Sequence, residues 1–179
     1  MALSRQRIAR AGLGLLNEVG LGNLTLRLIA RELGVQAPAL YWHVRNKQEL
    51  LDEMAAQMLR DAIRSLPEPD GDWERWLCEV ARAVRGALLD HRDGIRVYCA
   101  ACVTGPDLFD PRLFQPLLDA GFEQRDVGRA WSALYAFVIG FAVEERTARP
   151  VTAPGDAGER FTDGLAVVLD GIRSRLSAN

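Results

Sequence analysis

Hydrophobic residues recur at helical spacing along nearly the whole chain, and no stretch alternates as an amphipathic strand does. Ile8, Leu15 and Val19 share one stripe of a first helix, predicted over residues 3 to 19 and ended by the glycine-rich turn 20 to 23. Further stripes predict later helices over 72 to 90, 94 to 104, 111 to 120, 124 to 147 and 157 to 177. We therefore expect an all-α protein.

Residues 24 to 51 have the pattern of a helix-turn-helix followed by a new capped helix. Thr25 is a suitable N-cap for the first helix, and Gly34 is a suitable C-cap. Pro38 suits the first turn of a short second helix over 37 to about 44. Asn46, with Glu49 three residues later, predicts a variant capping box that opens a fourth helix.

Two prolines and a glycine within residues 66 to 71 mark the clearest linker. The expected organisation is a three-helix head over 1 to 48, a connecting helix over 49 to 66, and a helical body over 67 to 179 for effector binding and dimerisation.

Charge is divided unevenly between these parts. Residues 1 to 49 carry seven Lys or Arg and three Glu, whereas the remaining residues carry 15 Lys or Arg and 21 Asp or Glu. A basic head on an acidic body is the electrostatic footprint expected of a module that faces phosphates. Chance asymmetry in a soluble protein is the alternative.

Nothing in the chain predicts secretion or membrane insertion. The longest apolar run, 130 to 143, has 14 residues, fewer than the ~20 that a membrane helix needs. The three cysteines show no disulfide framework. We expect a cytoplasmic location.

The two predicted C-terminal helices are apolar on more than one side. Such helices bury one side in their own subunit and the other against a partner. Gly164 and Gly171, seven residues apart near one line, suit close helix approach. These features predict a homodimer joined by a four-helix bundle, with ordinary core packing in a monomer as the alternative.

Motifs for catalysis and metal binding are weak. His91-Arg92-Asp93 lacks the asparagine of a kinase catalytic loop, and no nucleophile or acid–base pair supports an enzyme. Cys99 and Cys102 have the spacing of a redox or metal pair, which makes a thiol- or metal-responsive sensor the alternative function. Their apolar helical setting instead favours core residues.

The head resembles the TetR family of repressors, particularly its tetracycline-repressor branch. The matching segments are LNEVG (16 to 20), LGV (33 to 35) and ALYWHVRNKQELLDEM (39 to 54), with a second short match at ALLDHRDG (87 to 94). The resemblance implies a dimeric transcriptional repressor that leaves a palindromic DNA operator when a small effector binds its body.

Candidate DNA contacts follow partly from helix geometry and partly from this resemblance. Tyr41 cannot share the inward line of Leu40 and Val44, so its ring is expected to face DNA. Trp42 is predicted to be a core anchor. The resemblance implies that Arg27 reads guanine, that Thr25 and Lys47 bind phosphate, and that Pro38 makes an apolar base contact. His43 is either a phosphate contact or structural. The full predicted set is Thr25, Arg27, Gln36, Ala37, Pro38, Ala39, Tyr41, His43 and Lys47.

Ala37 and Ala39 stand where tetracycline repressors carry glutamine and threonine, so we expect a different operator sequence. Tyr98 likewise stands where those repressors have a histidine that coordinates drug-bound magnesium. We therefore expect an apolar or aromatic effector and no metal or cofactor. The candidate effector contacts, whose alternative role is core packing, are Trp73, Trp76, Tyr98, Phe114, Trp131, Tyr135 and Glu144.

Overall fold

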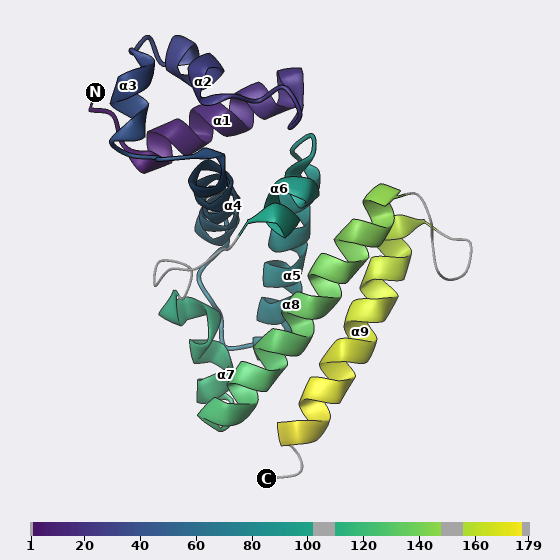
Figure 1. Cartoon of the computed structure of the whole chain (residues 1–179). Coiled ribbons are helices and arrows are strands. Elements are labelled where there is room, and N and C mark those ends of the chain that lie inside the picture. The colour runs from purple at the N-terminus through teal and green to yellow at the C-terminus, as the bar shows by residue number, and fades with distance from the viewer. Residues whose placement is uncertain (1, 102–109, 148–155, 177–179) are drawn as a thin grey trace. The chain divides into compact units, whose positions relative to one another are not determined.

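The computed structural model describes residues 2–101, 110–147 and 156–176 (Figure 1). These residues form helices and connecting turns, with no strand among them, so the all-α prediction is confirmed. The chain divides into two compact units. The head unit comprises residues 1–64 and 86–108, and the body unit comprises 65–85 and 109–179.

The head unit contains α1 (Arg5–Val19), α2 (Leu26–Glu32), α3 (Ala37–Tyr41), α4 (Lys47–Arg64) and α6 (Gly94–Ala100). Its core is a stripe from each helix, including the fully buried Ile8, Ile29, Leu40 and Met54. Gly12 lets α4 approach α1 closely, since a Cβ there would lie 2.9 Å from the Met54 Sδ. The helix-turn-helix is therefore held on a packed base formed mainly by α1 and α4.

The predicted capping residues occupy the predicted ends. Thr25 Oγ1 accepts the Leu28 N–H at 3.2 Å. Gly34 has φ +66, and Val35 N–H donates to Ala30 O at 3.0 Å, closing a Schellman motif. Asn46 Oδ1 accepts the Glu49 N–H, and a carboxylate oxygen of Glu49 accepts the Arg45 N–H, both at 2.9 Å.

α3 is shorter than predicted. The His43 N–H donates to Leu40 O, only three residues back, at 2.9 Å. Leu40 O also accepts the Val44 N–H, four residues on, at 2.8 Å. The last turn therefore shares one carbonyl between two donors, and the regular helix ends at Tyr41 rather than near Val44.

The body unit contains most of α5 (Trp73–Leu89), the short helix η2 (Pro111–Leu113), α7 (Gln115–Asp119), α8 (Gln124–Thr147) and α9 (Ala157–Leu176). Asp110 caps η2, since its carboxylate accepts the Arg112 N–H at 2.9 Å. The single helix predicted over 111 to 120 is wrong, because Pro116 has no N–H to continue the bonding of η2 into α7. Of the helix predicted over 94 to 104, residues 102 to 104 lie outside the described residues.

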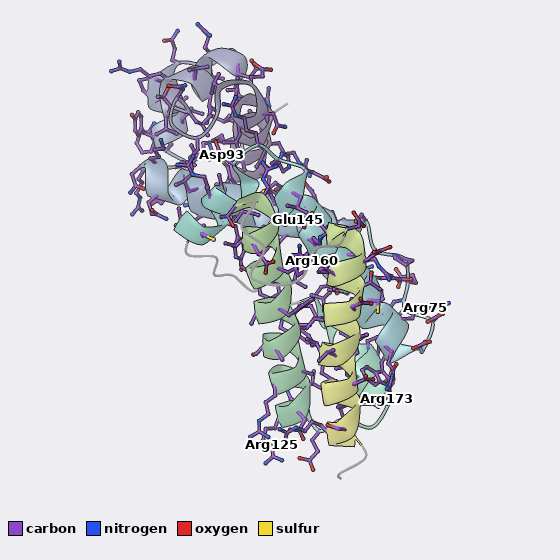
Figure 2. All side chains as sticks on the ribbon, turned by 90° about the vertical axis from the view of Figure 1, so that its right-hand side faces the viewer. Arg75, Asp93, Arg125, Glu145, Arg160 and Arg173 are labelled. Carbon is purple, nitrogen blue, oxygen red and sulfur yellow. The ribbon has the colours of Figure 1, made fainter. Side chains whose placement is uncertain are left out.

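α8 and α9 run side by side in both views (Figures 1 and 2). A Cβ on Gly164 would lie 2.7 Å from the Phe137 ring, so a glycine is needed where α9 meets α8. Near the end of α8, the Arg160 side chain donates to Glu144 at 2.5 Å. Arg85 of α5 donates to both carboxylate oxygens of Glu145, at 2.8 and 2.9 Å. These paired charges join three helices at one end of the body unit.

Among the described residues, α8 alone is long and apolar enough to cross a membrane by length and composition. One such helix is weak evidence for a membrane span, since core helices pass the same test. In this structure one side of α8 packs in the body unit, where Leu134, Val138 and Ala142 are buried.

Candidate nucleic-acid interface and effector site

The outer surface of α3 and the turn after it present two large aromatic side chains to solvent. Tyr41 is 50% exposed, as its outward direction predicted. Trp42 is 90% exposed, so its assignment to the core is wrong. Leu40 and Val44 already fill the inward positions, and Trp42 lies about half a helical turn away from them. The same geometric argument that placed Tyr41 outward would have placed Trp42 outward too.

The other predicted DNA contacts occupy the same helix-turn-helix. Gln36 and Pro38, at the start of α3, are exposed, while Ala37, Ala39 and His43 are partly buried. Arg27 is exposed in the first turn of α2. Thr25, which caps α2, is exposed directly before it. The surface therefore combines small residues, exposed aromatic rings and a guanidinium, all suited to contact base edges in the major groove.

Lys47 is exposed at the first residue of α4, and its Nζ donates to Leu21 O at 3.1 Å. An ammonium has three N–H donors. One of them binds this carbonyl, which fixes the position of the ammonium. The other two can donate to a phosphate oxygen.

Three of the predicted effector residues form an aromatic cluster in the body unit. The rings of Phe114 and Trp131 meet edge to face with centroids 5.1 Å apart, and Trp131 stacks on Tyr135 at 6.1 Å. All three side chains are only partly buried. We call Phe114, Trp131 and Tyr135 the aromatic cluster. Stacked and edge-to-face rings of this kind are also the contacts that a planar aromatic molecule makes.

The other four predicted effector residues have different surroundings. Trp76 is 2% exposed, and its indole N–H points to Leu113 O at 3.4 Å. Trp73 is also buried and meets Phe122 edge to face at 5.1 Å. Tyr98 packs against the core of the head unit. Glu144 is bound by Arg160.

The cysteines do not assemble into a site among the described residues. Cys99 is exposed on α6, so the prediction that it lies in the core is wrong, and Cys102 lies outside the described residues. Burial raises the pKa of the Cys78 thiol. In the part of the chain that the structure describes, no three His, Cys, Asp or Glu side chains are grouped to hold a metal ion.

Residues of α8 and α9 line a groove of about 420 Å³. Its apolar lining includes Ala130, Ala133, Val168 and Ile172, and the acid Asp126 faces the same space as Arg129 and Arg175. Val167, which also lines the groove, is 71% exposed. A Cβ on Gly171 would meet nothing within 4 Å. This is an apolar helix face with room for the backbone of another helix.

Two family models match this chain. Residues 8–54 match the model for bacterial regulatory proteins of the tetR family, and residues 66–155 match the tetracyclin repressor-like C-terminal domain. The tetracycline repressor protein class A from transposon 1721 of Escherichia coli is 37% identical, over 97% of this chain and 92% of that protein.

Two solved structures resemble the whole chain. TetR (class A) in complex with 5a,6-anhydrotetracycline and magnesium is 37% identical, with a TM-score of 0.77 over 97% of this chain and 99% of that one. BioQ with its natural double-stranded DNA operator is 31% identical, with a TM-score of 0.71 over the same shares of the two chains.

Proposed function

This chain belongs to the TetR family of DNA-binding transcriptional repressors with an effector-binding C-terminal domain, and we propose that it occupies a palindromic operator until a small aromatic effector releases it. The observation that carries the proposal is the pair of exposed rings, Tyr41 and Trp42, beside the reading helix α3. An exposed tryptophan is costly to hydrate, and the neighbouring major-groove contacts would cover it.

We assign different roles to two groups of side chains on the head unit. Arg27, Pro38 and Tyr41 contact bases or their immediate surroundings, with Gln36, Ala37 and Ala39 close to the base edges. Thr25, Lys47 and His43 contact phosphate. Trp42, which the sequence pattern had not suggested, joins the interface. The DNA-contacting part is residues 1 to 48, while α4 and α6 pack with it in the head unit and support its shape.

The protein acts as a homodimer through α8 and α9. The apolar groove, the exposed Val167 and the open space above Gly171 support this assignment. Two copies present two identical heads, and a two-fold protein matches an inverted repeat in DNA.

The effector binds within residues 67 to 179, with the aromatic cluster as its stacking surface. A magnesium–drug chelate of the kind bound by the class A tetracycline repressor is disfavoured in this chain. Glu144, the one acid among the candidate effector contacts, is paired with Arg160, and one acid without other ligands is a poor magnesium site. A planar apolar molecule needs neither a metal ion nor a free carboxylate in order to bind.

The thiol- or metal-sensor alternative has no support among the described residues. No cluster of three potential metal ligands is present there, and the raised pKa of Cys78 keeps its thiol protonated and less reactive at neutral pH. As a DNA-binding regulator the protein is assigned to the cytoplasm and is not an enzyme.

Selection of duplexes from a random-sequence library by the purified full chain tests the proposal. We expect enrichment of one inverted repeat. Planar aromatic compounds that raise the melting temperature should then lower affinity for that repeat, whereas anhydrotetracycline with magnesium should not. Enrichment of no sequence would overturn the assignment as an operator-binding regulator, and release by the magnesium chelate would overturn the effector class.

A further inference from the structure

We propose that Asp93 is a positioning residue for DNA binding, which holds Lys47 in place for its phosphate contact by way of Leu21. Asp93 belongs to the HRDG turn, residues 91 to 94, between α5 and α6 (Figure 2). The inference rests on the proposed function, because it requires Lys47 to contact DNA.

Two hydrogen bonds connect Asp93 to Lys47 through one residue of the α1–α2 turn. Asp93 Oδ2 accepts the Leu21 N–H at 2.9 Å. Leu21 O in turn accepts a hydrogen bond from Lys47 Nζ at 3.1 Å. The carboxylate therefore fixes the backbone whose carbonyl orients the exposed ammonium.

The conformation of Asp93 directs its carboxylate to the α1–α2 turn rather than to its own helix. Asp93 occupies the N-cap position of α6, where an aspartate ordinarily accepts an N–H of its own helix, yet it makes no such bond. Its φ of 59 is the only positive value of a non-glycine residue in the described part of the chain. Residues held in this region persist when the surrounding structure fixes them. Here the carboxylate binds Leu21 and, at 3.0 Å, Arg96.

Arg92 fastens the same turn to the end of α1. Its N–H donates to Asn17 Oδ1 at 2.8 Å, and its guanidinium donates to Glu18 O at 3.3 Å. Gly20, with φ +74, lies against that guanidinium, since a Cβ there would be 3.3 Å from it. The HRDG turn thus supports the α1–α2 turn at several points, while the bond from Asp93 is the one that leads directly to Lys47.

The test uses the full chain, the selected inverted repeat and a scrambled duplex, with affinity measured at several salt concentrations. Asp93→Gly removes the carboxylate but tolerates the positive φ. Asp90→Gly is the matched control, because it removes the same charge from an exposed residue three positions earlier. Both changes are also made together with Lys47→Ala.

We expect Lys47→Ala to weaken both duplexes and to lower the salt slope by about one unit for each phosphate that is no longer bound. Asp93→Gly should weaken binding about tenfold, lower the slope similarly, and have little further effect once Lys47 is alanine. Asp90→Gly should stay within about twofold of the wild type.

An equal effect of Asp93→Gly in both backgrounds, including no effect, would overturn the inference while leaving the proposed function intact. If Lys47→Ala alone leaves the salt slope unchanged, the phosphate assignment fails and the inference falls with it. Should Asp93→Gly not fold, Asp93→Asn decides by the same comparison, because a neutral amide is a weaker acceptor. Its binding should be about threefold weaker with Lys47 present and unchanged without it.

Discussion

At the scale of single residues, Trp42 offers a direct optical test of where DNA binds. It is 90% exposed, whereas Trp73 and Trp76 are buried. We expect iodide to quench Trp42 emission strongly in the free protein and weakly on the selected operator, because DNA covers the ring. In Trp42→Phe, most of the difference in quenching between free and operator-bound protein should disappear. Unchanged quenching on saturation with operator would show that Trp42 lies outside the interface.

Two aspartates, Asp93 and Asp110, make the free energy of unfolding depend on pH in the acidic range. The Leu21 N–H, followed by Arg96, lowers the pKa of Asp93 below its ordinary 3.8, and Arg112 does the same for Asp110. A depressed folded-state pKa stabilises the protein above the ordinary value, and this contribution is lost as pH falls through the folded-state pKa.

We therefore expect the urea midpoint to fall below about pH 4, and to fall less steeply in Asp93→Asn and Asp110→Asn than in the wild type. Urea titrations between pH 6 and pH 2 measure this. Parallel curves for all three proteins would contradict these assignments.

At the scale of helices, two glycines of α9 should respond in opposite ways. Gly164 meets Phe137 of the same subunit, so Gly164→Val should destabilise the fold by about 1 to 3 kcal/mol through overpacking. Gly171 meets nothing within 4 Å, so Gly171→Arg should retain helix content but give monomers with weak operator binding. Gly14→Arg, at another open helical glycine, is the control. Dimers of Gly171→Arg in sedimentation would place the interface elsewhere.

The long helices could be predicted from the sequence because many periodic positions and clear caps define them. α8 has the predicted bounds, and α9 begins at the predicted residue. The ends of the short helices could not be predicted in this way, because they depend on local details: the bonds that Leu40 O accepts from His43 and Val44, and the missing N–H of Pro116. The contact between Leu21 and Asp93 joins residues 72 positions apart, and no local pattern indicates it.

At the scale of the whole molecule, the central claim is that one end of the chain reads DNA sequence through Arg27 and binds phosphate through Lys47. Both side chains are exposed on the head unit, at the starts of α2 and α4. Bidentate guanine contacts discriminate between sequences, whereas phosphate contacts do not.

Binding isotherms of the wild type, Arg27→Ala and Lys47→Ala on the selected operator and a scrambled duplex test this claim most directly. Arg27→Ala should cost about 1 to 3 kcal/mol on the operator and leave scrambled DNA nearly unchanged. Lys47→Ala should weaken both duplexes alike. If Arg27→Ala instead lowers both affinities by the same factor, Arg27 contacts phosphate and the account of sequence recognition is wrong.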